Sequence, residues 1–163
     1  VFYVVFDSEC SMLIHHGICK EWKVTKEELA KVAEENTPRL FPAHIMMPED
    51  VIRKIFDIEE TENVFSSIPM YFITNQYSLY GAGTILYPKV LSELAEKLNS
   101  DLYIFPSSIH EMCVILANED NGPKRLIDIV REVNKSTVDK EDYLGDNIYL
   151  YKKDTGELSM ITE

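Results

Sequence analysis

The sequence predicts an α+β fold in which helices pack on a largely antiparallel sheet. Short apolar runs typical of strands alternate along the chain with stretches whose apolar residues recur at helical spacing. The chain has 163 residues, of which 45% are apolar, and this is the size and composition of one globular domain. We therefore expect a single α+β domain over residues 1–163.

The first part of the chain begins with a strand-like run at residues 2–6. Thr25 and Glu28 then form a capping-box pair, and the apolar residues that follow them predict a helix. Pro38 disfavours a helical conformation at Thr37, so we expect this helix to end near Asn36.

A second helix is expected to begin at Pro48, because proline suits the first turn of a helix. Residues 57–62 read Asp-Ile-Glu-Glu-Thr-Glu, an acidic run that indicates a solvated loop. A loop over residues 57–66 is therefore a possible subdivision of the domain. The buried face of the second helix would consist of Val51, Ile52, Ile55 and Phe56.

The second part of the chain contains most of the predicted sheet. Residues 81–83 (Gly-Ala-Gly) indicate a flexible hairpin connection, and residues 154–156 (Asp-Thr-Gly) indicate a tight turn between two strands. Helices are expected to begin at Pro88 and at Pro123. Strands are expected at residues 69–74, 84–87, 102–105, 109–116, 147–151 and 157–161.

From residue 84 the predicted order is strand, helix, strand, strand, helix, strand. This is the βαββαβ order of ferredoxin-like domains, and profilin-like sheets use similar strings, so both arrangements stay open. Asp139 and Asp142 are expected to cap and open an additional short helix that ends at Gly145.

Composition narrows the classes of partner. The chain has 16 Lys and Arg against 28 Asp and Glu, a net charge of −12, and such a surface repels phosphate backbones. We therefore expect no nucleic-acid partner. No apolar run is long enough to span a bilayer, so no membrane association is expected.

Three cysteines (Cys10, Cys19 and Cys113) are an odd and sparse set, which argues against a secreted disulfide framework. The chain also has no leader-like segment. We expect a cytoplasmic protein without a cofactor. The abrupt start at Val1 predicts a fragment that lacks an N-terminal region.

The main candidate site is the segment of residues 107–111. If residues 107–116 are extended, Ser108 and His110 share one face of the strand, and Ser107 and Glu111 share the other. A serine nucleophile needs a base and a third group that orients the base. Ser108, His110 and Glu111 are candidate catalytic residues, but Glu111 would face away from His110. A ligand pocket or a hydrogen-bonded turn suits the segment better.

Cys10, His15, His16 and Cys19 are the ligand types of a tetrahedral zinc site. Their spacing departs from that of the common closed motifs. If residues 12–16 form a strand, His15 and His16 face opposite sides and cannot both bind one ion. We therefore expect no metal site.

A series of short segments gives the chain its resemblance to a known family. These are Glu21-Trp22, residues 24–29, residues 35–38, Met70-Tyr71, Thr74-Asn75, residues 86–88, residues 105–111, residues 131–134 and residues 146–149. With these segments in this order, the chain resembles an uncharacterised bacterial family that is common in anaerobic gut clostridia. The resemblance implies no established activity, substrate or cofactor. Its Pro-Ser-Ser-x-His-Glu segment matches residues 106–111 without a gap.

Three functions remain open. The favoured one is a non-enzymatic domain that binds a protein or a small molecule, with a binding site at Ser107, Ser108, His110, Glu111 and Asn75. The second is a hydrolase or transferase that uses Ser108 and His110 in a pocket completed by distant residues such as Asn75, Tyr80 or Arg131. The third is a structural half of a two-domain protein.

Overall fold

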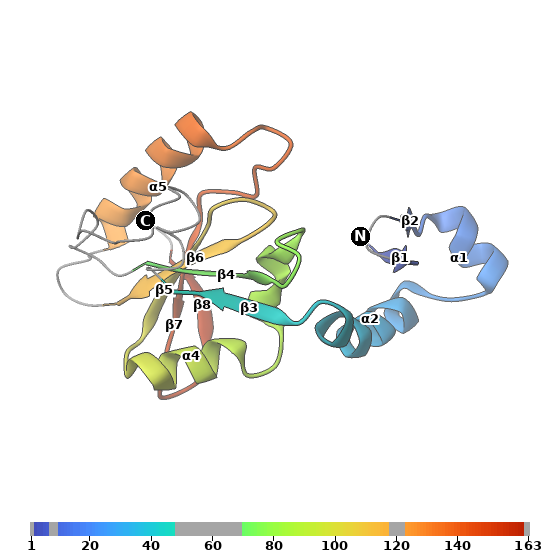
Figure 1. Cartoon of the computed structure of the whole chain (residues 1–163), viewed down its shortest axis with the longest axis horizontal. Helices are drawn as coiled ribbons and strands as arrows, with labels where there is room; N and C mark the ends of the chain where they lie inside the picture. Colours follow the sequence, from blue (N-terminus) through green and yellow to red (C-terminus); the bar gives the residue numbers. More distant parts are fainter. Residues whose placement is uncertain (1, 7–9, 48–69, 118–122, 162–163) are drawn as a thin grey trace, which may run out of the picture. The chain divides into compact units, whose positions relative to one another are not determined.

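A computed structural model of the chain describes residues 2–6, 10–47, 70–117 and 123–161. The chain divides into two compact units, Val1–Phe41 and Pro42–Glu163 (Figure 1). The helix predicted to begin at Pro48, with its face at residues 51–56, lies outside the described residues. The same holds for the acidic loop predicted at residues 57–66.

The first unit contains a short hairpin and two helices. Strands β1 (Tyr3–Val5) and β2 (Ser11–Leu13) pair antiparallel, and helices α1 (His16–Trp22) and α2 (Lys26–Leu40) follow. The predicted capping box at the start of α2 is confirmed. The backbone N–H of Thr25 donates to Glu28 Oε2 at 2.8 Å, and the backbone N–H of Glu28 donates to Thr25 Oγ1 at 3.1 Å.

The predicted end of this helix near Asn36 is wrong, because α2 continues through Pro38 to Leu40. A proline inside a helix removes one hydrogen bond, the one to the carbonyl four residues before it. Pro38 lies in the last turn of α2, and the hydrogen bond that closes this turn is present: Phe41 N donates to Thr37 O at 2.8 Å. The preference for an extended residue before proline is therefore overridden here.

The second unit is built on a six-stranded sheet in which every pair of neighbouring strands is antiparallel. Its spatial order is β3-β4-β6-β5-β7-β8. The strands are β3 (Ala43–Met46), β4 (Tyr71–Asn75), β5 (Leu102–Pro106), β6 (Met112–Leu116), β7 (Ile148–Tyr151) and β8 (Leu158–Ile161). The structure thus confirms the α+β class and the largely antiparallel sheet.

Helices α4 (Val90–Leu98) and α5 (Pro123–Thr137) lie on opposite sides of this sheet (Figure 1). The βαββαβ order is present, but it begins at β4 rather than at residue 84. The ferredoxin-like detail is not confirmed, since β7 pairs with β5 and two strands separate it from β4. No helix in the described ranges combines the length and apolar composition needed to cross a membrane.

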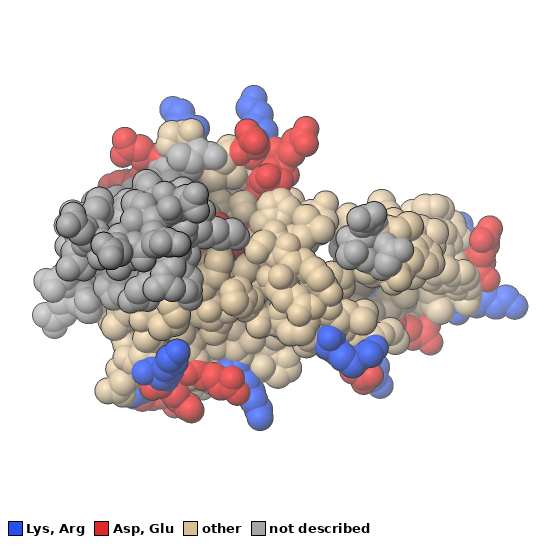
Figure 2. Space-filling model, viewed as in Figure 1, with Lys and Arg blue, Asp and Glu red and all other residues tan. Residues whose placement is uncertain are grey.

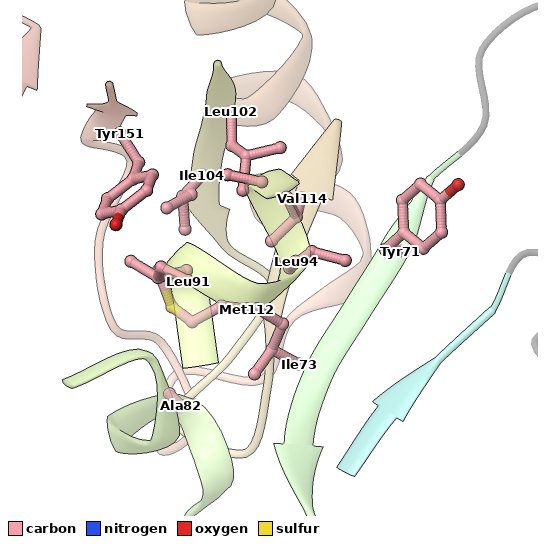
Figure 3. Close-up of a cluster of buried hydrophobic side chains, with 11 residues drawn as sticks. Tyr71, Ile73, Ala82, Leu91, Leu94, Leu102, Ile104, Met112, Val114 and Tyr151 are labelled. Carbon is pink, nitrogen blue, oxygen red and sulfur yellow. The ribbon is translucent and has the colours of Figure 1, made fainter. Parts of the chain in front are cut away.

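Two apolar clusters fill the two sides of the sheet. Since successive strand residues point to opposite faces, β6 contributes Met112 and Val114 to one cluster and Cys113 and Ile115 to the other. The first cluster packs under α4 (Figure 3), and the second packs under α5. The first contains Tyr71, Ile73, Ala82, Leu91, Leu94, Ala95, Leu102, Ile104, Met112, Val114 and Tyr151, and the second contains Phe105, Cys113, Ile115, Leu126, Ile127, Val130 and Ile148.

The strand predicted at residues 84–87 is wrong: Gly81–Leu86 form a 3-10 helix, η1. The prediction of a flexible hairpin connection at residues 81–83 is wrong as well. Gly81 is buried, and a Cβ there would collide with Thr74 Oγ1 and lie 2.6 Å from Asn75 N and 2.7 Å from His110 O. This glycine is therefore needed because two backbone segments pass too close for a side chain.

Two further local predictions are corrected. Strand β6 begins at Met112, so residues 107–111 form a loop between β5 and β6 and do not alternate between faces as strand residues would. The short helix predicted from Asp139 to Gly145 is absent from this described part of the chain; residues 140–142 form a turn. Gly145 has φ +149°, a value that favours glycine, but it ends no helix.

The predicted β7–β8 hairpin is confirmed, and Asp101 holds its turn against the start of β5. One oxygen of the Asp101 carboxylate accepts from Lys152 Nζ at 2.8 Å, and the other accepts from the backbone N–H of Lys153 at 2.9 Å. The hydrogen bond from Lys152, followed by the one from Lys153, lowers the pKa of Asp101 below its ordinary value of 3.8.

Replacing Gly81 with Ala should lower the free energy of unfolding by about 1–3 kcal/mol, the usual effect of an added methyl group in a closely packed interior. The matched control is Gly83→Ala, where an added Cβ meets nothing within 4 Å. This variant should be unchanged or more stable by about 0.4–1 kcal/mol. Urea unfolding of both variants checks the prediction, and equal midpoints would contradict it.

Asp101→Asn should destabilise the protein at neutral pH and lose most of that effect at an acidic pH below the lowered native pKa of Asp101. A carboxylate with a lowered native pKa stabilises the folded state fully above its ordinary pKa, and this contribution is lost as pH falls through the native value. Urea unfolding of wild type and variant at both pH values measures the difference. Asp154→Asn, whose side chain is 90% exposed, is the control and should show little pH-dependent change.

Candidate functional site

Three connecting segments meet at one end of the six-stranded sheet. Strands β4 and β5 run in the same direction, and β6 and β7 run opposite to them. At this end of the sheet, β4 and β5 therefore end where β6 and β7 begin. The turn after β4, the β5–β6 loop and the connection from α5 to β7 therefore lie together (Figure 1). The candidate residues 107–111 are the β5–β6 loop itself.

This loop closes on itself through Glu111. The backbone N–H groups of Ser107 and Ser108 both donate to the carbonyl oxygen of Glu111, at 3.2 and 3.3 Å. Ser107 Oγ lies 3.4 Å from Glu111 Oε1, and Ser108 Oγ accepts from the backbone N–H of His110 at 3.0 Å. Both serines thus stabilise the turn, as the hydrogen-bonded interpretation of the sequence predicted.

The ring of His110 joins the two other segments. Its Nδ1 accepts from the backbone N–H of Tyr80 at 3.0 Å, and its Nε2 lies 3.3 Å from Asp142 Oδ1. An imidazole that accepts at Nδ1 carries its proton on Nε2 when neutral, so Nε2–H is the donor to Asp142. The Tyr80 ring lies against the imidazole, with 5.4 Å between centroids and a tilt of 31°.

Further hydrogen bonds fix the main chain of His110 and of its neighbour Ile109. Thr74 Oγ1 donates to the carbonyl oxygen of His110 at 2.8 Å, and this is the oxygen that a side chain at position 81 would approach. The neighbouring Ile109 donates its N–H to Asp142 O at 2.8 Å and accepts from Ala82 N at 3.2 Å. The position of His110 is therefore set by β4, by η1 and by the connection after α5.

Asn75, the fifth predicted binding residue, is buried at the end of β4 and shapes the turn that follows. Its Oδ1 accepts from the backbone N–H groups of Tyr77 and Leu79, at 2.9 and 3.4 Å, and its Nδ2 donates to Leu79 O at 2.7 Å. These contacts hold residues 76–79 in place before Tyr80. Asn75 therefore positions the Tyr80 side of the site.

The arrangement around His110 differs from that of a serine hydrolase site. Neither ring nitrogen of His110 bonds to Ser108 Oγ, because Nδ1 is taken by Tyr80 and Nε2 faces Asp142. The acidic partner of His110 is Asp142 and not Glu111, so the sequence argument missed the residue that orients the imidazole. Only the tertiary structure brings Asp142, which lies more than thirty residues along the chain, to His110.

The remaining nucleophile near the loop is Cys113, which is buried under α5. Burial, with a smaller contribution from the charge of Glu111, raises the pKa of this thiol far above its ordinary value. A protonated buried thiol is a poor nucleophile. Cys113 therefore belongs to the apolar core.

The residues weighed as zinc ligands do not form a site. His15 is the N-cap of α1, and its Nδ1 accepts from Gly17 N at 3.1 Å. Residues 12–16 are therefore not one strand, since β2 ends at Leu13. In the described ranges of the chain, no group of three or more His, Cys, Asp or Glu side chains is placed to hold a metal ion.

Exposed aromatic and apolar side chains lie on the two segments that contact the His110 ring. Tyr80 is 61% exposed, Tyr77 53% and Tyr143 48%, and Leu79 and Leu144 lie beside them in sequence and are also exposed. Acidic side chains of the α5–β7 connection gather next to a surface of uncharged residues (Figure 2). We call this group the Tyr80–Asp142 face: Tyr77, Leu79, Tyr80, Asp142, Tyr143 and Leu144, which lie on the two segments that the His110 ring joins.

A second polar contact supports the α5–β7 connection. Nδ2 of Asn134 on α5 donates to Gly145 O at 3.1 Å and to Asp146 Oδ1 at 3.0 Å. A hydrogen bond to Asp146 raises the pKa of the Tyr143 hydroxyl. Two segments of the resemblance, residues 131–134 and 146–149, are therefore in direct contact, and they hold the chain on which Asp142 and Tyr143 lie.

Comparison with known proteins identifies the family and no function. A family of unknown function, DUF5688, matches residues 1–153, and the chain belongs to this family. No curated protein matches the chain, and no solved structure matches it.

His110→Ala should lower the free energy of unfolding by about 1 kcal/mol, because the Tyr80 N–H and the Asp142 carboxylate lose their partner. The matched control is His44→Ala on the edge strand β3, whose side chain is exposed and should matter less. Thermal or urea unfolding measures both. An equal effect of the two substitutions would mean that the His110 contacts do not stabilise the fold.

Proposed function

We propose that this DUF5688 chain is a non-enzymatic domain that binds another protein through the Tyr80–Asp142 face. The observation that carries the proposal is that exposed tyrosines and leucines lie on the two segments that His110 joins through its two ring nitrogens. Contiguous exposed apolar side chains with polar neighbours are typical of protein interaction sites. Tyrosine in particular is enriched among the residues that dominate binding energy.

The hydrogen bonds of the β5–β6 loop support binding over catalysis. Ser107, Ser108 and Glu111 use their polar groups within the loop, and Asn75 uses its side-chain amide in the turn before Tyr80. A hydrolase would need a ring nitrogen of His110 available to take a proton from Ser108. In the described contacts this nitrogen already accepts from Tyr80. These four residues therefore serve to position the face.

Rigidity is the second argument for an interaction role. A surface that is ordered before binding loses less conformational entropy when the partner arrives. Tyr80 is held by its backbone bond to His110 and by the ring contact, and the turn that carries Tyr77 and Leu79 is held by Asn75. The exposed side chains thus stand on a fixed support.

The cysteines support a cytoplasmic location as part of this proposal. Cys10, Cys19 and Cys113, all within the described residues, form no disulfide, and Cys10 is exposed. Exposed free thiols are compatible with a reducing compartment, whereas secreted proteins usually pair theirs.

Immobilised wild-type protein should retain a specific protein from extract of the source cells, and Tyr80→Asn should bind that protein about 30-fold more weakly. Asn suits this test because it tolerates the left-handed backbone of Tyr80, φ +52°, while removing the ring. The dissociation constant of the identified species is measured for wild type, Tyr80→Asn and a control. The control is Trp22→Gln, which removes another exposed aromatic side chain, in the first unit.

Equal affinities for all three chains would contradict the proposal. A serine-reactive probe that labels wild type but not Ser108→Ala would also contradict it, because it would indicate an activated nucleophile.

A further inference from the structure

We propose that protonation of His110 detaches the backbone of Tyr80 from the β5–β6 loop, so that the Tyr80–Asp142 face binds its partner more weakly as pH falls. The inference rests on the proposed function and specifies how that function is regulated. It follows from the two ring nitrogens of His110, which contact two different segments of the chain. Nδ1 contacts the N–H of Tyr80, and Nε2 lies beside Asp142.

The contact with Tyr80 exists only while the His110 ring is neutral. Nδ1 accepts from the backbone N–H of Tyr80 at 3.0 Å, and for this it must carry a lone pair and no proton. The His110 side chain is 28% exposed and can exchange a proton with water, and histidine is the side chain whose charge ordinarily changes between about pH 5 and 8. Once Nδ1 is protonated, two N–H donors face each other. The Tyr80 N–H therefore loses this acceptor.

The contact with Asp142 changes in the opposite direction. Nε2 lies 3.3 Å from Asp142 Oδ1, and it carries a proton in the neutral ring and in the charged ring alike. Protonation places a positive charge opposite the carboxylate and strengthens this contact. The backbone bond from Ile109 N to Asp142 O does not involve the ring and is retained. The loop thus stays attached to the α5–β7 connection while it loses its bond to Tyr80.

The groups that face the ring come from three segments. The α5–β7 connection contributes the carboxylate of Asp142, which is preceded by the charged and exposed residues 139–141. The turn after β4 contributes Tyr80, whose ring centroid lies 5.4 Å from that of the imidazole. Glu111, on the same loop as the histidine, lies near Ser107, and Thr74 of β4 does not titrate. The carboxylate beside Nε2 is therefore the charge that acts on the ring most directly.

Loss of the Tyr80 bond weakens the support of the face. Asn75 holds residues 76–79, and the bond from Tyr80 N to Nδ1 ties this turn to the β5–β6 loop. A surface that is less ordered before binding loses more conformational entropy when the partner arrives. Affinity should therefore be highest above the pH at which His110 titrates and should fall as pH decreases through that range.

The test follows amide hydrogen exchange in the ¹⁵N-labelled full chain between about pH 5 and 8, with the ring protons of His110 reporting its titration. Each rate is divided by the intrinsic rate at the same pH to give a protection factor. We expect the protection of the Tyr80 amide to fall about fivefold as the His110 ring titrates, the equivalent of one hydrogen bond. The amide of Ile109 should keep its protection, because its acceptor is the carbonyl oxygen of Asp142.

His110→Asn is the decisive variant, because its amide oxygen can accept from Tyr80 in place of Nδ1 but does not titrate. The protection of Tyr80 should then be independent of pH. The matched control is His44→Asn, which removes an exposed titrating ring on β3 and should leave the response of Tyr80 as in wild type.

Three results would overturn the inference. The first is a Tyr80 amide whose protection stays constant while the His110 ring titrates. The second is a pH response that persists in His110→Asn. The third is an equal loss of protection at Ile109, because the loop as a whole would then open in acid.

The two proposals fail in different ways. If a captured protein depends on Tyr80 but its affinity for wild type and for His110→Asn changes with pH to the same extent, the domain binds protein and the inference about His110 is wrong. If Tyr80 protection follows the titration of His110 but no captured protein depends on Tyr80, the release of Tyr80 is supported and the proposed protein-binding function is wrong.

Discussion

The arrangement of the second unit at the candidate site depends on the close approach of three backbone segments at the carbonyl oxygen of His110. This oxygen accepts from Thr74 at the end of β4 and lies where any side chain at position 81 would collide with it. Because Gly81 has no Cβ, the start of η1 can lie close to the end of β4 and to the β5–β6 loop. Tyr80 is then adjacent to the His110 ring, and its N–H satisfies Nδ1. The glycine at position 81 thus allows Tyr80 to reach His110. The neighbouring Ile109 binds the backbone of Asp142 and brings that residue to the same place.

This constraint also supports the proposed recognition role over a catalytic one. General acid–base catalysis by histidine needs a ring nitrogen that can exchange a proton with substrate or nucleophile. At His110 one nitrogen accepts from the backbone and the other faces Asp142, so the ring acts as a support. The polar groups of the loop are likewise used within the protein. The exposed groups on the neighbouring segments are tyrosine and leucine side chains, and the carboxylate of Asp142 is partly exposed.

The sheet supplies the rigid base for this surface. Its central strands are buried on both faces, under α4 on one side and α5 on the other, and all neighbours are antiparallel. The ends of β4 and β5 and the starts of β6 and β7 therefore lie at fixed positions relative to one another. Loops that connect such strands are held close together, which is a common origin of binding sites. The contact of Asn134 with residues 145 and 146 extends this support to the segment that carries Asp142.

The sequence by itself determined the elements whose signals are local. Apolar periodicity identified α4, α5 and the strands of the six-stranded sheet other than β3, the capping box marked the start of α2, and residues 154–156 marked a hairpin turn, because these patterns depend on neighbouring residues alone. It also singled out residues 107–111 as polar residues between apolar runs. Only the tertiary structure decided that Gly81 opens a 3-10 helix and not a flexible link, and that Asp142, not Glu111, faces His110. Both depend on contacts between segments far apart in the chain, and no local pattern records which backbone passes close enough to exclude a side chain.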